Sequence, residues 1–264
     1  MAVVDALGRE VVVDPHPDRV VSLCPSQTEL LFKLGVGDRV VGVTKFCVHP
    51  KAQVQQRARV GGTKNVDIER VRALRPDLVL AEKEENTHET VLELEREFPV
   101  FVTDVVDVDS ALAMITTVGR VLGAEEPAAA LRSSIRVSLE ELDVAKRWRV
   151  LYLIWREPWM AAGRDTYIDS VMRTCGFDNV VEGSRYPELT LNSMQHLEPD
   201  FVFLSSEPFP FRDRHRQEVG AAMPTPGIVH VDGEIFSWYG SRMMLIAPYI
   251  RELRRQLVRV DREV

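Results

Sequence analysis

The chain has 264 residues, of which 45% are hydrophobic, so it can bury the core of one large domain or of two modest ones. Its formal net charge is −7, and acidic and basic residues alternate without a long basic run. This pattern argues against a nucleic-acid surface and against an anchor on an anionic membrane. The expected partners are therefore small molecules or proteins.

The N-terminal segment does not have the pattern of a secretory signal, because Asp5, Arg9 and Glu10 interrupt the apolar run that such a signal needs. The sequence has no stretch of about 20 apolar residues that could cross a membrane. The three cysteines form no CxxC pair and are odd in number, which disfavours a disulfide framework. We therefore expect a cytoplasmic monomer that is not embedded in a membrane, unless a leader was removed.

The first predicted elements are a buried strand at residues 20–23 and a helix that follows it. The S-x-x-E spacing of Ser26 and Glu29 is typical of a capping box and predicts that the helix begins there. A second strand is predicted at residues 40–43. The order strand, helix, strand is typical of a parallel α/β arrangement.

The same pattern returns about 130 residues later, with a strand at 149–154, a helix at 167–175 and a strand at 179–181. A second repeat consists of a helix, a Leu-x-Pro-Asp break and a buried strand. It occurs at residues 71–80 and again at 194–203. The sequence therefore predicts two similar α/β lobes, each built on a parallel sheet.

Residues 105–147 show no strand pattern, and Pro127 stands where a first-turn proline is favoured. Apolar residues at helical spacing predict one amphipathic helix from about residue 126 to 147. This segment should join an N-terminal lobe (1–104) to a C-terminal lobe (148–264) as a long, rigid α-helix. Two lobes bridged in this way are expected to move little.

Open α/β sheets bind ligands outside the carboxyl ends of their strands, and residues suited to a ligand follow the predicted strands of both lobes. The candidate ligand-binding residues are Cys24, Pro25, Ser26, Phe46, Cys47, His49, Glu82, Lys83, Trp155, Arg156, Trp159, Trp238, Tyr239 and Arg242. We expect them to converge from both lobes on one space of ligand size.

Aromatic side chains after strands would suit the face of a flat macrocycle or a conjugated chelate. This interpretation is favoured over core packing for Trp155 and Trp238, whereas the two are evenly balanced for Trp159. Arg156 and Arg242 could bind carboxylates or amides on the rim of such a ligand. An ordinary surface role suits Arg156 almost as well.

His49 follows Cys47 by two residues and could be an axial ligand to iron or cobalt. A structural role is favoured for both residues. His49-Pro50 is also typical of a turn, and Cys47 is typical of a small buried residue. Cys24 and Cys47 together would not make a zinc site. The sequence has no GxSxG, HExxH or GxGxxG motif, so the common hydrolase, zincin and dinucleotide signatures are absent.

The chain resembles the helical-backbone (class III) substrate-binding proteins, which receive cobalamin, haem or ferric siderophores for ABC transporters. The resemblance lies in the order of VVSLCPSQTELLFKLG, VVGVTKFCVHP, DIERVRALRPDLVLAE, GRDTYIDSVMRTCGFDNVV and FSWYGSRMMLIAPYIREL. It is closest to the vitamin B12 (cobalamin)-binding members and spans nearly the whole chain. It implies two lobes with a bridging helix and a binder of a metal chelate, with no intrinsic cofactor and no catalytic machinery.

Members of this family are periplasmic or lipid-anchored outside the membrane, and they dock on an ABC transporter permease through one acidic residue on each lobe. Glu69 matches the first of these residues, whereas Asn192 stands where the second is expected. The resemblance therefore implies a permease partner for which one half of the docking pair is missing.

The leading hypothesis is a binding protein for a metal chelate, in ABC-type uptake or in intracellular handling. The alternative is a chelatase-like enzyme that acts on a tetrapyrrole, with His49 and Glu84 or Glu85 removing protons from pyrrole nitrogens. A third interpretation is an importer receptor with an unusual export route. An enzyme would consume free metal and free macrocycle with turnover, whereas a binder would hold the finished chelate.

Overall fold

The computed structural model describes residues 1–223 and 227–261, which form two compact units. Unit 1 comprises residues 1–105, 109–135 and 239–242, and unit 2 comprises the other described residues. The end of the predicted C-terminal lobe, residues 262–264, lies outside the described residues. The predicted α/β fold class is confirmed.

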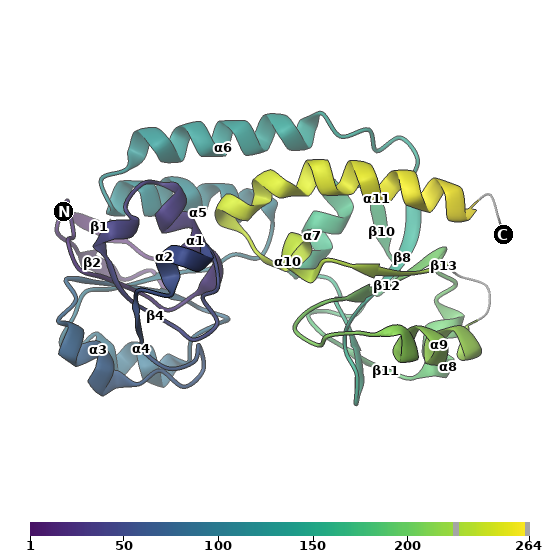
Figure 1. The fold of residues 1–264 in the computed structure, drawn as a ribbon, viewed down its shortest axis with the longest axis horizontal. Coiled ribbons are helices and arrows are strands. Elements are labelled where there is room, and N and C mark those ends of the chain that lie inside the picture. The colour runs from purple at the N-terminus through teal and green to yellow at the C-terminus, as the bar shows by residue number, and fades with distance from the viewer. Residues whose placement is uncertain (224–226, 262–264) are drawn as a thin grey trace. The chain divides into compact units, whose positions relative to one another are not determined.

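The sheet of unit 1 is fully parallel, with the order β5-β4-β3-β6-β7. Figure 1 labels β4 of this sheet together with helices α1, α3 and α4 of the same unit. Its strands are β3 (Val20–Ser22), β4 (Val40–Val43), β5 (Ala58–Arg59), β6 (Leu78–Glu82) and β7 (Val100–Thr103). Every residue of β3, β6 and β7 is buried, as expected for strands with both faces covered. The chain reverses its direction across the sheet between β3 and β6, and such a switch point is where open α/β sheets bind ligands.

The helices of unit 1 connect these strands. They are α1 (Pro25–Lys33), the short 3-10 helix η1 (Gly37–Arg39), α2 (Lys51–Val54), α3 (Ile68–Leu74), α4 (His88–Leu94) and α5 (Val108–Val121), most of which lies in this unit. Helix α1 begins at Pro25 with Cys24 as its N-cap, so the predicted capping box at Ser26 is wrong. Proline is favoured at the first helical position because it has no N–H that would need a partner there.

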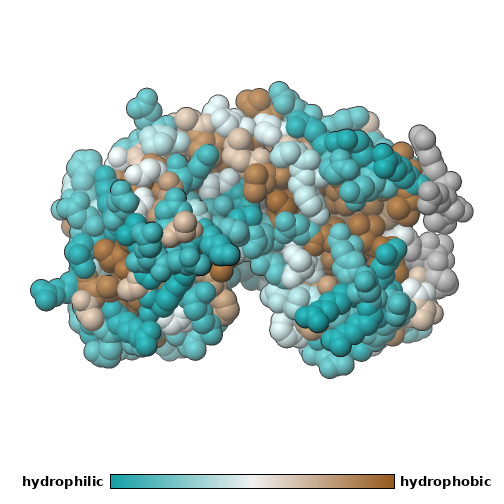
Figure 2. All heavy atoms as spheres, viewed as in Figure 1, coloured by the Kyte–Doolittle hydropathy of each residue, from teal (hydrophilic) through white to brown (hydrophobic). Residues whose placement is uncertain are grey.

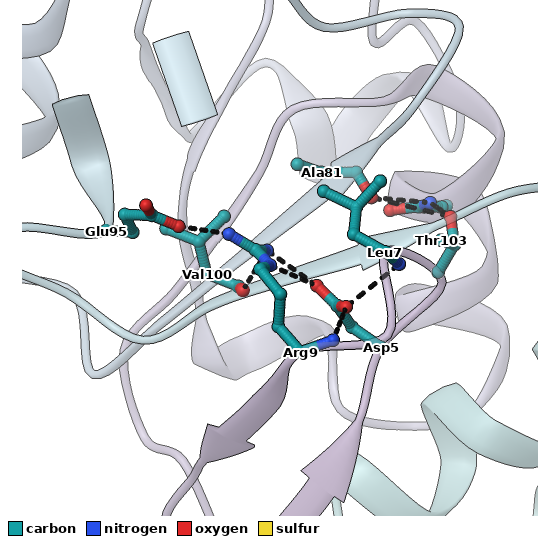
Figure 3. A network of polar contacts seen from close by, with 8 residues as sticks. Asp5, Leu7, Arg9, Ala81, Glu95, Val100 and Thr103 are labelled. Atoms are coloured by element: carbon teal, nitrogen blue, oxygen red, sulfur yellow. Dashed lines mark hydrogen bonds and ion pairs between the residues drawn. The ribbon is translucent and has the colours of Figure 1, made fainter. Parts of the chain in front are cut away.

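An N-terminal hairpin of β1 (Ala2–Val4) and β2 (Glu10–Val12) is fixed to unit 1 by a buried carboxylate. Asp5 accepts hydrogen bonds from the backbone N–H of Arg9, at 3.0 Å, and from its guanidinium, at 2.6 Å. Figure 3 shows the same guanidinium reaching Glu95 and the carbonyl oxygen of Val100. The hairpin is therefore anchored to the end of α4 and the start of β7.

The sheet of unit 2 is mixed. Its strands are β8 (Trp148–Trp155), β9 (Trp159–Ala161), β10 (Phe177–Asn179), β11 (Glu188–Leu189), β12 (Phe201–Ser205) and β13 (Gly227–Val231). Strands β10 and β12 run parallel to β8, and β13 runs parallel to β12. Strands β9 and β11 are antiparallel additions, because the chain folds back after Trp155 and pairs Leu153 with Ala161. The sequence predicted only parallel pairing here.

The remaining helices are α6 (Glu125–Glu140), α7 (Tyr167–Thr174), α8 (Leu191–His196), α9 (Asp213–Ala222), α10 (Gly233–Ser237), the 3-10 helix η2 (Gly240–Leu245) and α11 (Ile246–Asp261). Helix α6 contributes residues to both units. It is shorter than the predicted helix at 126–147, because Asp143 accepts a hydrogen bond from the N–H of Ala145 at 3.1 Å. Such local side-chain bonds compete with the helix.

The Leu-x-Pro-Asp repeat has a structural role in unit 1. The carboxylate of Asp77 accepts hydrogen bonds from the backbone N–H groups of Asp18, at 2.8 Å, and Arg19, at 2.9 Å. The guanidinium of Arg19 donates in turn to the carbonyl of Leu74 at the end of α3, at 2.6 Å. The start of β3 and the end of α3 are thus held together by charge-assisted bonds.

Unit 2 repeats this arrangement with different residues. Asp200 accepts from the backbone N–H of Arg149 at 2.7 Å, and the Arg149 guanidinium donates to the carbonyl oxygens of Leu197, at 2.7 Å, and Glu198, at 3.1 Å. Glu198 has a positive φ of 46°, as Arg75 does at the matching position of unit 1, with 43°. The sequence repeat therefore encodes one junction that is used in both units.

In the part of the chain that the structure describes, no helix is long and apolar enough to cross a membrane. On the face drawn in Figure 2, hydrophilic residues cover most of the surface and hydrophobic residues form smaller patches among them.

We predict that Asp200→Ala destabilises unit 2 by about 1–3 kcal/mol, because it leaves the strand-start N–H of Arg149 without its acceptor. Unfolding in urea followed by tryptophan fluorescence measures this, since Trp148, Trp155, Trp159 and Trp238 all belong to unit 2. Glu182→Ala is the control, because its side chain is 83% exposed. It should change the free energy of unfolding by less than about 0.5 kcal/mol. Equal effects of the two changes would contradict the structural role of the repeat.

Candidate functional site

The end of β3 places a buried thiol at the switch point of unit 1. Cys24 Sγ lies 3.2 Å from Ser26 Oγ and 3.4 Å from the hydroxyl oxygen of Tyr239. Burial raises the pKa of Cys24 to about 12, and the carboxylates of Glu85 and Glu82 add to the shift. The thiol is therefore neutral and, as it stands, is not a nucleophile.

Tyr239 reaches Cys24 on a four-residue segment, 239–242, which we call the strap. The strap belongs to unit 1 although the residues on either side of it belong to unit 2. Gly240 has a φ of +83°, a conformation that favours glycine, and a Cβ placed there would lie 3.4 Å from Leu30 Cβ on α1. The strap thus packs closely against α1.

A two-pronged ion pair holds the strap to α1. Arg242 Nε lies 2.9 Å from Glu29 Oε2, and Arg242 Nη2 lies 3.2 Å from Glu29 Oε1. The Arg242 side chain is only 9% exposed, so this pair is shielded from water more than an ordinary surface pair. Arg242 was predicted to bind ligand, and the structure shows its guanidinium already engaged with Glu29.

The loop after β6 carries a second buried group beside the thiol. Glu82 is 1% exposed, and its Oε2 accepts from the backbone N–H groups of Glu84, at 2.7 Å, and Glu85, at 2.9 Å. Its Oε1 is buried without a hydrogen-bond partner of good geometry among the described residues. Burial raises the pKa of Glu82 to about 7. Lys83, also a predicted site residue, is exposed and forms an ion pair with Asp104 at 2.5 Å.

Asn86 fixes this loop to the end of β3, a role that the sequence analysis missed. Its side-chain amide donates to the carbonyl oxygens of Leu23, at 3.3 Å, and Thr63, at 3.0 Å, and accepts from the N–H of Glu82 at 2.8 Å. The only signal in the sequence was its place in the loop that follows a predicted strand.

The predicted site residues in the loop after β4 differ in their exposure to solvent. Phe46 is 50% exposed, and Lys45 Nζ lies 4.9 Å from the centre of its ring. Cys47 is fully buried, with its Sγ 3.1 Å from Thr28 Oγ1 and 3.2 Å from Thr44 Oγ1, and burial raises its pKa. The Cys47 thiol therefore serves packing.

His49, which was predicted with low weight as a metal ligand, is half-buried in the same loop. Within residues 1–223 and 227–261, no group of three or more His, Cys, Asp or Glu side chains is arranged to hold a metal ion. A role of His49 as an axial ligand to a chelated metal stays a prediction.

In unit 2, the two tryptophans of the β8–β9 hairpin have different environments. Trp155 is 39% exposed and packs against Phe209, with ring centres 5.6 Å apart. Trp159 is 6% exposed, because Phe211 stacks on its ring at 6.0 Å and the guanidinium of Arg156 lies 4.6 Å from its ring centre. Trp155 therefore offers an aromatic surface, whereas Trp159 belongs to the core.

The Arg156 side chain forms an ion pair with Glu218. Its Nη2 and Nε lie 2.6 Å and 3.1 Å from the two carboxylate oxygens of Glu218 on α9. The hydrogen bond to Glu218 raises the pKa of Arg156. As it stands, Arg156 braces the hairpin against α9.

A carboxylate after β12 is a further residue that the sequence analysis missed. Glu207 Oε1 accepts from Ser237 Oγ at 2.6 Å, and burial raises its pKa. Glu207 stands where Glu84 stands in the repeat of unit 1, so both units place an acidic loop after the corresponding strand. Trp238, next to Ser237, is half-buried.

A separate, shallow pocket of about 510 Å³ lies at the amino end of β8 in unit 2. It is lined by Arg149, Asn179, Val180, Val181, Glu182, Gly183, Pro187, Leu189, His196 and Leu197. The residues predicted to bind ligand do not contribute to its lining.

The two predicted docking residues occupy matching positions on matching helices. Glu69 is the second residue of α3, with a side chain that is 79% exposed and paired with Arg72. Asn192 is the second residue of α8 and is also exposed. Their contact with a permease stays a prediction.

Residues 20–223 match the model of the family described as Periplasmic binding protein, and the chain belongs to this family. The family consists of substrate-binding proteins rather than enzymes, which confirms the resemblance drawn from the sequence.

Individual relatives agree with this assignment. The chain is 29% identical over 211 residues to the uncharacterized ABC transporter substrate-binding lipoprotein YvrC of Bacillus subtilis (strain 168). The aligned region covers 75% of this chain and 67% of that protein. The chain is 22% identical over 246 residues to the vitamin B12-binding protein of Pectobacterium atrosepticum, covering 89% and 87%. The periplasmic heme-binding protein BhuT, in complex with two hemes, has the same fold with a TM-score of 0.79 and 25% identity, covering 90% of this chain and 97% of BhuT.

We predict that Arg242→Ala exposes the Cys24 thiol. Losing the charged hydrogen bonds to Glu29 should weaken the strap by about 1.5–3 kcal/mol, which raises the rate of thiol labelling by roughly ten- to 150-fold. Labelling with a disulfide reagent measures this rate. The wild type should react slowly, because all three of its cysteines are buried.

Two further variants identify the thiol that reacts. Arg251→Ala removes an exposed pair with Glu141, 3.6 Å long, and should leave the labelling rate unchanged. Adding Cys24→Ala to Arg242→Ala should abolish the fast phase. A fast phase that persists without Cys24 would show that the strap does not cover this thiol.

Proposed function

We propose that this chain binds a metal chelate of the class that includes cobalamin, haem and ferric siderophores, as the substrate-binding protein of an ABC-type uptake or handling system. The observation that carries the proposal is the exposed indole of Trp155 at the carboxyl end of β8, supported from behind by Phe209. A half-exposed aromatic face at a strand end suits a flat, conjugated ligand.

The two units offer different chemistry for this purpose. Unit 1 contributes the polar groups around Cys24 and Glu82, and unit 2 contributes aromatic surface around Trp155. The vitamin B12-binding and heme-binding proteins named above support the ligand class. The predicted convergence of both sets on one ligand stays a prediction.

The proposal assigns binding and no chemical reaction to the site. The thiol of Cys24 is neutral, since burial raises its pKa to about 12, and the Arg156 guanidinium is already paired with Glu218. A chelatase would have to show turnover. Incubating the protein with ferrous or cobaltous ion and free protoporphyrin, and following the absorbance of the product, tests this alternative.

We predict that cobalamin, haem or a ferric siderophore quenches the tryptophan fluorescence of the protein. Trp155→Ala should weaken binding of that chelate by about 1–3 kcal/mol, or roughly five- to 150-fold, because it removes a buried aromatic contact of the complex. Titrations followed by absorbance measure the dissociation constants. Val137→Ala is the control, because Val137 is 50% exposed on α6. The proposal fails if the wild type binds no chelate, and the role of Trp155 fails if both variants bind as the wild type does.

A permease partner is the second part of the proposal, and it rests on Glu69 and Asn192. Asn192 carries no charge, so we predict that Asn192→Glu strengthens binding to a B12-type ABC permease by up to about 1 kcal/mol, the value of one exposed ion pair. Affinity for the permease in detergent or nanodiscs measures the effect. Gln195→Glu, three residues further along α8, is the control for added charge. A wild type that already stimulates the transporter as strongly as Asn192→Glu does would contradict the prediction.

A further inference from the structure

The acidic groups at the switch point of unit 1 lie deeper than the basic ones. Glu82 is 1% exposed and Glu85 is half-buried, whereas Lys64 and Lys83 are exposed. Each lysine also has a contact elsewhere, since Lys83 pairs with Asp104 and Lys64 donates to the carbonyl oxygen of Glu84. The inner part of this surface is therefore dominated by hydrogen-bond acceptors.

Glu85 is held in place by Glu82. The Oε2 atom of Glu82 accepts from the backbone N–H of Glu85 at 2.9 Å, and Asn86, the next residue, ties the loop to Leu23 at the end of β3. The Glu85 carboxylate lies close enough to the Cys24 thiol to raise its pKa, after burial itself. Within the described residues, this carboxylate forms no ion pair.

The two carboxylates at this point have different contacts. Glu82 Oε1 is buried without a hydrogen-bond partner of good geometry, although a backbone hydrogen bond from Val105 lowers the pKa of the Glu82 carboxyl group. The Glu85 carboxylate is half-buried, so a ligand that supplies a hydrogen-bond donor can give it a partner. The neighbouring groups, Cys24 and Tyr239, are neutral because burial raises the pKa of both.

We propose that the loop of Glu82 and Glu85 makes unit 1 selective for chelates whose side chains carry amides, and that it rejects chelates whose side chains carry carboxylates. An amide N–H can donate to Glu85, whereas a carboxylate in that place would meet a like charge at a half-buried site. Glu85 is the contact residue and Glu82 is a positioning residue. The inference rests on the proposed function, since it names the substrate class of the same site.

The charge at this site changes within the physiological pH range. Burial raises the pKa of Glu82 to about 7, and the carboxylates of Glu85 and Asp104 add to the shift. Lys83 is paired with Asp104, and the other groups that face Glu82, Cys24 and Tyr239, stay neutral. Above pH 7 the site therefore gains one negative charge. Binding of a carboxylate ligand should weaken from pH 6 to pH 8, while binding of an amide ligand should change little.

The test uses two corrinoids with the same ring and the same cobalt: dicyanocobinamide, with amide side chains, and dicyanocobyrinic acid, with carboxylates. The wild type should bind the amide form at least about tenfold more tightly at pH 8, and this ratio should fall at least about threefold at pH 6. Absorbance titrations give both dissociation constants.

Three variants test which residues cause the preference for the amide form and its pH dependence. Glu85→Gln should reduce the ratio at every pH, and Glu82→Gln should remove its pH dependence. Glu89→Gln, an exposed change on α4, should leave the ratio as in the wild type. Circular dichroism verifies the fold of each variant, and Glu85→Gln alone keeps the test decisive if Glu82→Gln does not fold.

The outcomes distinguish a failure of this inference from a failure of the proposed function. Equal binding of both corrinoids by the wild type, or a preference for the carboxylate form, overturns this inference and leaves the proposed function standing. Binding of neither corrinoid, nor of haem or a ferric siderophore, overturns the proposed function and the inference with it.

Discussion

The parallel pairing of β3 with β6 determines what unit 1 can bind. Val20 lies beside Leu78 and Ser22 beside Leu80, so the next residues of both strands end at the same edge of the sheet. This register brings the thiol of Cys24 and the carboxyl group of Glu82 into one neighbourhood. The Glu82 carboxylate raises the pKa of Cys24 because of that proximity, and the exclusion of water raises the pKa of both groups because it penalises their charged forms.

Unit 2 uses the same framework for other chemistry. Its junction between Asp200 and Arg149 repeats the junction of unit 1, yet the chain beyond β8 folds back into a hairpin instead of entering a helix directly. The hairpin displays Trp155 and buries Trp159 between Phe211 and Arg156. One structural arrangement thus supports an acidic, thiol-bearing strand end in unit 1 and an aromatic strand end in unit 2.

Strands and repeats could be predicted from the sequence because they depend on local periodicity. The β-branched runs of β3 and β6 and the Leu-x-Pro-Asp breaks have clear patterns over several residues. The side-chain environments could not be predicted. Trp159 is buried by Phe211, which is 52 positions away in the chain, and no pattern around Trp159 itself carries that information.

The same reason explains the unforeseen place of the strap. A segment of four residues is too short to show a period, and the pairing of Arg242 with Glu29 joins residues that are 213 positions apart. The unpartnered oxygen of Glu82 could not be predicted either, because its burial depends on tertiary packing. Sequence patterns therefore gave candidates for the site at strand ends, and only packing distinguished structural residues from exposed ones.

The strap also has a consequence for how the protein is made. Residues 1–135 supply nearly all of unit 1, but its last piece, 239–242, leaves the ribosome roughly 100 residues later. At about 5–20 residues per second, the thiol of Cys24 stays without its cover for roughly 5–20 s of every synthesis. During that interval a nascent chain can fold most of unit 1 while the thiol of Cys24 lacks its contact with Tyr239, so the order of the chain sets a brief period in which oxidants meet a different surface from that of the finished protein.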